Sequence, residues 1–409
     1  MATGPKRPTA AKGLTEVKRL KYSVAGEWKD TASGQYMPIT DSSTGRVIAE
    51  APCCTAAEVE AAVRAASDAF PGWSETPVTQ RAQLMFAFKA KLDGHLDELA
   101  RMVSTELGKN PAEARGDVIK AIEGVELATA APITMQGDSL LNVSTGFDTV
   151  MYREPLGVFV GIAPFNFPAM IPFGWMLPLA ITTGNTLVLK AASQTPMTSM
   201  RLLELLYESG LPKGVVNLVT CRRAEAELLL KHPEVKGITY VGSLSVGRHV
   251  YQTAAAHGKR VQALCEAKNH ALVLRDASLE NAARVIINST FGCAGMRCMA
   301  LPVVCVEEVV ADEFVAHLAR FARELKVGCA YDPATELGPV VSVEHREAVE
   351  AWVTKGVEEG AEVVLDGRGL VVPDFEGGHF VGPTILDRVR PGMSVGDKEI
   401  FGPVTCIKR

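Results

Sequence analysis

The chain has 409 residues, of which 47% are hydrophobic and 22% are charged, and this balance is typical of a soluble globular protein with two or three domains. Its formal net charge of -5 comes without a basic stripe, which argues against nucleic acid and anionic membranes as partners and favours small metabolites. Its nine cysteines lack CxxC and Cys/His ligand spacing, so we expect a reducing compartment, no disulfide framework and no metal site.

Residues 1–23 are expected to form a flexible N-terminal tail. The first twenty residues carry five basic side chains and one acid, Glu16, as transit peptides do, but they lack an apolar face. A cytoplasmic location is therefore the first expectation, with the mitochondrial matrix as the alternative. The apolar segment at residues 169–181 is interrupted by two prolines and a glycine, and it is too short to cross a membrane.

The next part of the chain has helical periodicity. Thr55 and Glu58 form a capping box ahead of apolar residues at helical spacing, and this spacing returns from Arg81 to about Leu107. At residues 139–152 the composition changes to Ser, Thr, Gly and β-branched residues, which is typical of a hairpin. We expect this hairpin to stand off the body as an oligomerisation arm.

Strands and helices then alternate. Strands are expected at residues 157–163, 185–190, 215–220 and 237–241, with a broken helix before residue 181 and helices at 195–209 and from about Leu244. This order predicts right-handed crossovers and a parallel, doubly wound sheet of an α/β protein, which binds ligands at the carboxyl ends of its strands. Lys190 and Gly242 lie at such ends.

A second unit is expected from about Leu264. Its strands are predicted at residues 271–274 and 302–306, and its helices at 282–290, 311–325 and 344–359. Cys298 lies in a Gly-rich link between the first helix and the second strand, where a rigid scaffold can position a reactive group.

Two short runs fit one piece of chemistry. Residues 164–168 read PFNFP and offer an amide donor, whereas residues 295–298 read GMRC and offer a thiol. A thiolate can attack an aldehyde carbon while a fixed N–H donor stabilises the oxyanion that forms. A cysteine alone is weak support, because free cysteines are among the most buried residues.

The run GSLSVG at residues 242–247 departs from the GxGxxG order of dinucleotide sites. It is equally typical of a helix N-cap at Ser243 with glycines that ease packing. Its place after a strand favours a pyrophosphate site at the N-terminus of the helix.

Together with KEIFGPV at residues 398–404, these motifs resemble, in order and context, the aldehyde dehydrogenase superfamily from about residue 24 onward. The runs YREPLGV, PFNFPAMIP, AKNH and CMAL are most similar to its CoA-acylating methylmalonate-semialdehyde dehydrogenase branch. The resemblance implies a Rossmann-type NAD-binding domain at residues 24–136 and 153–263. It also implies a protruding hairpin arm at 137–152 and an α/β catalytic domain at 264–409.

The resemblance also implies roles for single residues. Cys298 is the implied nucleophile, and the Asn166 side chain with the backbone N–H of Cys298 is the implied oxyanion site. Lys190 is expected at the adenosine ribose, Glu399 at the nicotinamide ribose and Phe401 near the nicotinamide. The full set of implied cofactor-binding residues is Ala163, Phe165, Lys190, Ser193, Gly242, Ser243, Gly247, Glu399 and Phe401.

NAD is the cofactor that the branch implies, and coenzyme A is the co-substrate. Ser193 stands where a carboxylate would repel the 2′-phosphate of NADP, so NADP is permitted. The resemblance implies that two arginines bind the carboxylate of the aldehyde, and Arg297 and Lys120 stand at their positions. At Lys120 the ammonium group of lysine, a point charge, replaces the forked guanidinium group of arginine.

The acyl group that is bound to Cys298 as a thioester can be released by water or by CoA, and release by water needs a base. Hydrolytic relatives place a glutamate four residues before the lysine that is Lys268 here, and that position is Leu264. Leucine cannot activate water, whereas a CoA thiol ionises easily, so Leu264 favours acyl transfer to CoA. Glu266 replaces a glycine on what is expected to be the same strand face; we interpret it as structural or blocking, with a displaced base as the alternative. Met296 replaces a common glutamine.

Residues 404–407 are expected to lie in the middle of a strand, and the chain closes at Arg409 where family members continue. The resemblance implies that the further part completes the catalytic domain and pairs with a neighbour's hairpin in a dimer or tetramer, so an open sheet edge is expected. A fragment, a truncated chain and a degenerate member remain open.

Three functions follow from the residues and the resemblance. The first is CoA-acylating oxidation of methylmalonate or malonate semialdehyde to propionyl-CoA or acetyl-CoA through a cysteine thioester. The second is a hydrolytic, NAD(P)-dependent aldehyde dehydrogenase. The third is a catalytically impaired binding or interaction protein.

Overall fold

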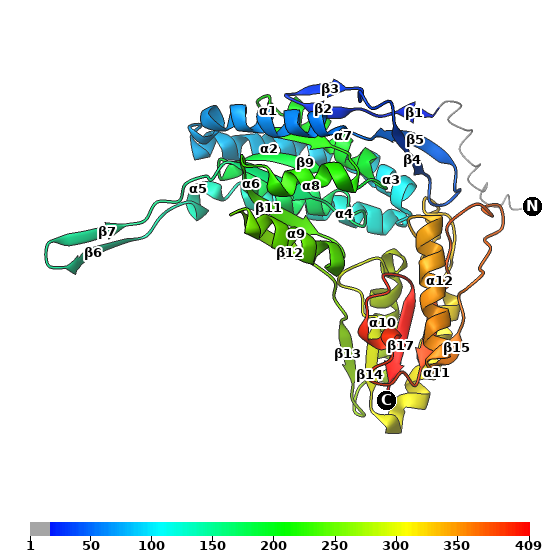
Figure 1. Cartoon of the computed structure of the whole chain (residues 1–409). Coiled ribbons are helices and arrows are strands. Elements are labelled where there is room, and N and C mark those ends of the chain that lie inside the picture. The colour runs from blue at the N-terminus through cyan, green and yellow to red at the C-terminus, as the bar shows by residue number, and fades with distance from the viewer. Residues whose placement is uncertain (1–16) are drawn as a thin grey trace, which may run out of the picture.

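The computed structural model describes residues 17–409, arranged as two lobes and a long arm (Figure 1). Most of the tail predicted for residues 1–23 lies outside the described residues. The end of that range differs from the prediction, because β1 (Lys18–Arg19) and β2 (Tyr22–Val24) are strands and the side chain of Tyr22 is buried. Within residues 17–409, no helix is both long and apolar enough to cross a membrane.

The larger lobe is built on a seven-stranded sheet. Its order is β12 (Arg260–Leu264), β11 (Val235–Val241), β8 (Val158–Ile162), β9 (Thr186–Lys190), β10 (Val216–Val219), β2 and β3 (Glu27–Lys29). The first five strands are parallel, and β2 and β3 continue the sheet in antiparallel fashion. The prediction of a parallel, doubly wound sheet is confirmed.

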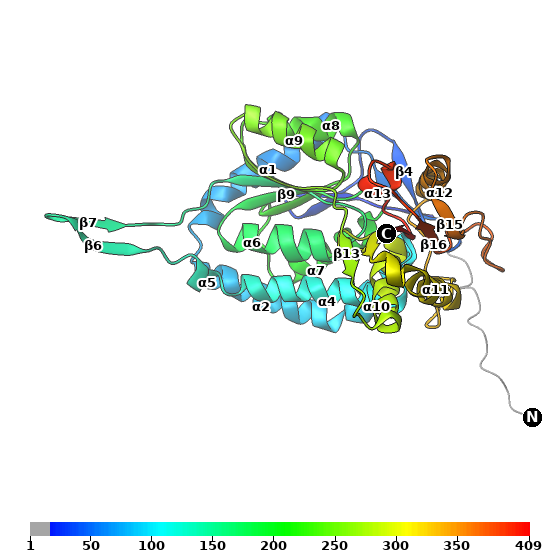
Figure 2. The ribbon, with the colours of Figure 1, turned by 90° about the horizontal axis from the view of Figure 1, so that it is seen from below.

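Helices cover both faces of this sheet, which explains its nearly continuous apolar strands. On β9, Val188 packs into one core cluster, whereas Leu187 and Leu189 pack into the other. Figure 2 shows α1, α8 and α9 on one side of the sheet and α2, α4, α6 and α7 on the other. The helices of this lobe and η1 are α1 (Ala56–Ser74), α2 (Val78–Gly94), α3 (Leu96–Leu107), α4 (Pro111–Ala128), α5 (Ala131–Thr134), η1 (Ile171–Met176), α6 (Leu177–Thr182), α7 (Pro196–Glu208), α8 (Arg223–Lys231) and α9 (Leu244–Ala256).

Local signals account for several of these boundaries. Thr55 caps α1 through a reciprocal capping box with Glu58, as the sequence predicts. The helix expected before residue 181 is broken, since the π-helix η1 precedes α6. A small sheet of β1, β5 (Val47–Pro52) and β4 (Tyr36–Thr40) was not predicted from the sequence.

The second lobe carries a five-stranded sheet in the order β13 (His270–Val273), β14 (Val303–Val306), β17 (Val404–Lys408), β16 (Thr384–Asp387) and β15 (Glu362–Leu365). The strand expected at residues 404–407 is β17, and it is paired on both sides in the middle of this sheet. Figure 2 shows α10 and α11 on one face and α12 and α13 on the other. The helical elements are α10 (Leu279–Phe291), η2 (Gly292–Gly295), α11 (Glu308–Glu324), α12 (Val343–Glu358) and α13 (Ser394–Asp397).

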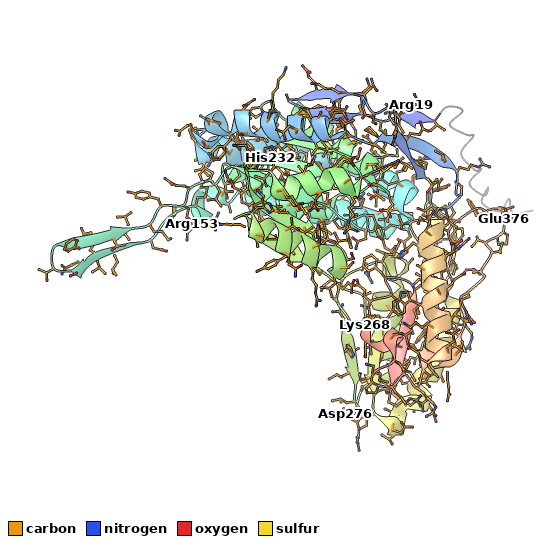
Figure 3. The ribbon with its side chains drawn as sticks, in the orientation of Figure 1. Arg19, Arg153, His232, Lys268, Asp276 and Glu376 are labelled. Atoms are coloured by element: carbon orange, nitrogen blue, oxygen red, sulfur yellow. The ribbon has the colours of Figure 1, made fainter. Side chains whose placement is uncertain are left out.

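The arm is the hairpin of β6 (Ser139–Ser144) and β7 (Phe147–Val150), and the sequence predicted it correctly. It projects far from both lobes in Figures 1 and 2, and Arg153 marks its base in Figure 3. Every residue of its two strands is exposed, including the apolar Leu141 and Phe147.

Candidate active site

A cavity of about 800 Å³ lies between the two lobes. One wall comes from the carboxyl ends of β8, β9 and β11, and the other comes from loops of the second lobe. This is the position at which open parallel sheets bind ligands. Of the predicted catalytic and cofactor-binding residues, those that line it are Ala163, Phe165, Asn166, Lys190, Ser193, Gly242, Ser243, Cys298, Glu399 and Phe401.

Cys298 is positioned by an unusual turn. Cys293 and Ala294 have φ angles of 53° and 51°, and Gly295 continues the left-handed backbone with 72°. A side chain at Gly295 would collide with the carbonyl oxygen of Gly402, so the cysteine loop and the segment with Glu399 approach each other backbone to backbone. Left-handed non-glycine residues are strained and need surrounding structure to hold them.

Asn166 joins the first motif to this loop. Its side chain is buried, and Nδ2 donates a hydrogen bond of 3.0 Å to the carbonyl oxygen of Met296. The amide has a second hydrogen that remains for another acceptor. Asn166 and Cys298 line the same cavity, and the Asn166 side chain lowers the pKa of the Cys298 thiol, so the two predicted catalytic groups lie near each other.

The surroundings of Cys298 change the pKa of its thiol. Burial raises the pKa of Cys298, and the nearby Glu399 carboxylate raises it further. The Asn166 amide and the backbone N–H of Cys298 lower the pKa and so oppose this rise. Burial also raises the pKa of Glu399, whose Oε1 accepts a hydrogen bond of 3.3 Å from Ala267 N–H.

The far end of the cavity contains Lys190 at the end of β9, where the sequence places it. Burial lowers the pKa of Lys190, and its Nζ contacts only the carbonyl oxygen of Ala191, at 3.4 Å, among the described residues. Ser193 lines the same end. A partly buried ammonium with so weak a partner is suited to bind a ligand's oxygen atoms.

The run at residues 242–247 leads from the end of β11 into α9, as the sequence predicts. Ser243 is the N-cap residue of α9, and Gly242 and Ser243 line the cavity. Gly247 does not line it; a side chain there would collide with the Cys265 sulfur, so Gly247 permits close packing between α9 and the loop after β12. Leu244 N–H, at the start of α9, donates a hydrogen bond of 3.0 Å to Glu266 Oε1.

One strand assignment of the sequence analysis is wrong. Strand β12 ends at Leu264, so Glu266 lies in the following loop and does not share a strand face with Leu264. Both residues line the cavity. Lys268, on the segment that joins the two lobes in Figure 3, is largely buried, and burial lowers its pKa.

The residues expected to bind a substrate carboxylate lie outside the large cavity. Arg297 Nη2 donates to the carbonyl oxygens of Asn288 at 3.0 Å and Ser289 at 2.6 Å, near the C-terminus of α10. Lys120 Nζ pairs with Glu123 at 2.6 Å on the exposed side of α4. Arg297 does line a small adjoining hollow with Cys298 and Glu399.

His345 was missed from the sequence. It lies in the first turn of α12 and lines the cavity, and its Nε2 donates to the carbonyl oxygen of Phe401 at 2.8 Å. Its ring packs edge-on against Phe165 and Phe401, whose rings are 5.8 Å apart and nearly perpendicular. No motif surrounds His345, so only the fold reveals that it joins the two lobes.

The sequence also did not reveal a set of charged residues that support the PFNFP and GMRC motifs. Lys109 Nζ and Asp117 Oδ2 form an ion pair of 3.0 Å with almost no exposed area, and Lys109 lies 3.4 Å from the ring centre of Phe167. Asp117 Oδ1 accepts the N–H of Met170 at 2.8 Å, and Glu113 Oε1 accepts the N–H of Cys293 at 2.6 Å. Helix α4 thus holds the loops that carry Asn166 and Cys298.

A doubly wound sheet whose carboxyl edge faces a cysteine across one cavity is the arrangement of a dinucleotide-dependent oxidoreductase. The sequence matches the aldehyde dehydrogenase family over residues 28–409, and the chain belongs to this family. Within the described residues, no group of three or more acidic, histidine or cysteine side chains is placed to hold a metal ion.

The chain is similar to several semialdehyde dehydrogenases of known sequence or structure. The chain is 47% identical over 396 residues to malonate-semialdehyde dehydrogenase 2 of Geobacillus kaustophilus, covering 97% of this chain and 81% of the relative. The crystal structure of a methylmalonate-semialdehyde dehydrogenase from Oceanimonas doudoroffii superimposes with a TM-score of 0.93 at 38% identity, covering 96% of this chain and 80% of that one. A candidate methylmalonate-semialdehyde dehydrogenase from Sinorhizobium meliloti, in complex with NAD, gives 0.94 at 35% identity, covering 97% and 80%.

Asp117→Asn is expected to lower the free energy of unfolding by about 3–5 kcal/mol, because the Lys109 ammonium would stay buried without a counter-charge. Urea denaturation followed by circular dichroism measures the loss. The matched control is Asp93→Asn, since Asp93 pairs with Lys89 at the same 3.0 Å but at the surface, and its loss should cost less than about 1 kcal/mol. If the two variants lost similar amounts of unfolding free energy, burial of the Lys109–Asp117 pair would not be the cause of the loss.

Alkylation of Cys298 by iodoacetamide is expected to be slow at neutral pH and to keep accelerating above about pH 8.5, the ordinary thiol pKa. Because burial and Glu399 raise the pKa of Cys298, a smaller fraction of this thiol is ionised at a given pH than of an ordinary cysteine. Glu399→Gln removes a charge that raises this pKa, so it should move the rate profile to lower pH. Mass spectrometry of the Cys298 peptide measures the rate, and an unchanged or upward-shifted profile in Glu399→Gln would refute the assignment.

Proposed function

We propose that this chain oxidises malonate or methylmalonate semialdehyde with NAD and transfers the acyl group to coenzyme A, giving acetyl-CoA or propionyl-CoA. The observation that carries the proposal is that Cys298, Asn166 and the strand ends of a dinucleotide-type sheet line one cavity. The names of the relatives support the substrate class, and the NAD complex of a structural neighbour supports the cofactor.

The proposed reaction begins when the Cys298 thiolate attacks the aldehyde carbon, with the thiol proton passing to solvent. The new oxyanion accepts hydrogen bonds from the free N–H of the Asn166 amide and from the backbone N–H of Cys298. Bound NAD supplies the hydride acceptor. Loss of hydride converts the thiohemiacetal to a thioester on Cys298, and the CoA thiolate then displaces the cysteine sulfur. With a semialdehyde that carries a β-carboxylate, CO₂ is also lost, and the carbon from which it leaves takes up a proton from solvent.

Acyl transfer to CoA is favoured over hydrolysis because of Leu264. Leu264 lines the cavity at the position of the hydrolytic base and offers no group that accepts a proton from water. The thiol of CoA, with a pKa of about 8.5, ionises far more easily than water and needs less help from a general base. The competing proposal is a hydrolytic enzyme that uses Glu266, which also lines the cavity. Its carboxylate is, however, engaged by Leu244 N–H at 3.0 Å.

The remaining assignments are proposed on the same basis. Residues 24–136 and 153–263 form the cofactor-binding domain, 137–152 the oligomerisation arm and 264–409 the catalytic domain. NAD is preferred, and Ser193 leaves NADP permitted because it brings no charge against a 2′-phosphate. Arg297 and Lys120 remain the proposed partners of the substrate carboxylate, although Arg297 would first have to leave the carbonyls of Asn288 and Ser289. A cytoplasmic homo-oligomer remains a prediction.

Rapid mixing of the protein with methylmalonate semialdehyde and NAD is expected to give a burst of NADH, followed by turnover only when CoA is present. Absorbance at the NADH band measures both phases. Cys298→Ala should abolish the burst, and Asn166→Ala should slow it about 10²–10³-fold through loss of one oxyanion donor. Equal steady turnover with and without CoA would instead identify a hydrolytic enzyme.

Glu266→Gln is expected to leave the hydrolysis rate of the acyl-enzyme unchanged, because Glu266 lies in the loop after β12, beyond the position of the hydrolytic base that Leu264 occupies. The acyl-enzyme is formed with NAD in the absence of CoA, and its decay is followed by mass spectrometry of the intact chain. A large fall in the decay rate would make Glu266 the displaced base.

A further inference from the structure

The carboxylate of Glu266 lies at the N-terminus of α9, and Glu266 itself belongs to the loop that follows β12. Its Oε1 accepts a hydrogen bond of 3.0 Å from Leu244 N–H, the first residue of the helix. The loop is anchored nearby, because Cys265 lies against Gly247 of the same helix. Glu266 therefore reaches the helix start through a defined position of the loop after β12.

Nothing else in the helix neutralises this end. Helix α9 has thirteen residues and no acidic residue in its first turn, and the side chain of its N-cap residue, Ser243, makes no capping bond. The free N–H groups and the aligned peptide dipoles of such an end attract an anion. In this structure the anion is the Glu266 carboxylate.

The same helix start is where the proposed cofactor needs to place its phosphates. Gly242, Ser243 and Glu266 all line the large cavity, next to the strand end that precedes α9. A pyrophosphate at this end would use the N–H groups of the first turn, as phosphates do at helix N-termini. Glu266 and a pyrophosphate cannot both accept from Leu244 N–H, and their like charges repel.

We propose that Glu266 is an internal anion that competes with the pyrophosphate of the dinucleotide for the N-terminus of α9, and so sets the affinity of the cofactor site. The proposal rests on the proposed NAD-dependent function. Glu266 is exposed to solvent and is held by a single hydrogen bond at this end, so it can move away when the cofactor enters. The contact therefore weakens cofactor binding without closing the site.

A catalytic role for Glu266 would give a different pattern. A general base acts on the acyl-enzyme and would leave binding of the cofactor to the free protein unchanged. A competing anion acts on every ligand that places phosphate at α9 and on no ligand that lacks phosphate. Binding measurements with the chain alone therefore separate the two roles without any reading of activity.

Isothermal titration calorimetry of the full chain with NAD, ADP and adenosine tests the proposal. Glu266→Gln removes the charge and keeps the shape of the side chain, and Glu266→Ala also removes the hydrogen-bond acceptor. The matched control is Glu280→Gln, which removes a carboxylate from the first turn of α10, outside the cavity. Thermal denaturation of each variant confirms that it is folded.

For NAD and ADP, the dissociation constant is expected to fall about fivefold in Glu266→Gln, the size of a charge effect at a helix terminus. It is expected to fall by at least as much in Glu266→Ala. Adenosine affinity should stay unchanged in both variants, and Glu280→Gln should bind all three ligands like the parent chain.

Two results would overturn the inference alone. The first is NAD binding to the parent chain with the same affinity as to both Glu266 variants. The second is an equal gain in affinity for adenosine, which would show an effect of shape and not of charge. Absence of NAD binding in the parent chain and in every variant would overturn the proposed function together with the inference. Binding of NAD only after Glu266 is replaced would support the competition by Glu266 and would overturn the proposed NAD-dependent function of the parent chain.

Discussion

The buried carboxylates of α4 are the constraint on which the site depends. Asp117 holds the backbone of Met170 after the PFNFP motif, and Glu113 holds the backbone of Cys293 before the cysteine. Lys109 balances Asp117 at 3.0 Å with almost no exposure to solvent. Because a buried charge without its partner is strongly destabilising, these contacts resist displacement. One helix of the larger lobe thereby fixes Asn166 relative to Cys298, although the two residues belong to different lobes.

The sequence predicted what depends on local chemistry. Apolar runs between helical segments indicated the parallel strands, and the ends of β9 and β11 placed Lys190 and Gly242 at the edge where the cavity lies. The capping box at Thr55 and Glu58 marked the start of α1. Motif order then implied that Cys298 and Asn166 act together, and the structure places both on one cavity, with Asn166 bonded to the cysteine loop at Met296.

Features that depend on contacts distant in sequence could not be predicted in this way. His345 enters the cavity because α12 packs beside the Phe401 loop, and no motif surrounds it. Glu266 was placed on a strand by its spacing from Leu264, but β12 ends first and the side chain turns to α9. The Arg297 side chain donates hydrogen bonds to carbonyl oxygens in the last turn of α10, where the helix itself no longer supplies N–H donors. In each case a neighbouring element decides where the side chain lies, and the sequence gives only its type.

The charges of the cavity are divided between its two ends. Near Cys298 the charge is that of the Glu399 carboxylate, which together with burial raises the pKa of the thiol. Toward the end of β9 the cavity presents Lys190, whose charge has only a weak partner among the described residues. A long ligand with a cationic ring at the thiol end and oxygen-rich groups at the other end matches this division better than a uniformly anionic ligand. The oxidised dinucleotide has that distribution, with its phosphates between the two ends. In the proposed binding mode the phosphates lie at the N-terminus of α9, between the thiol and Lys190, where the Glu266 carboxylate accepts the N–H of Leu244 in this structure.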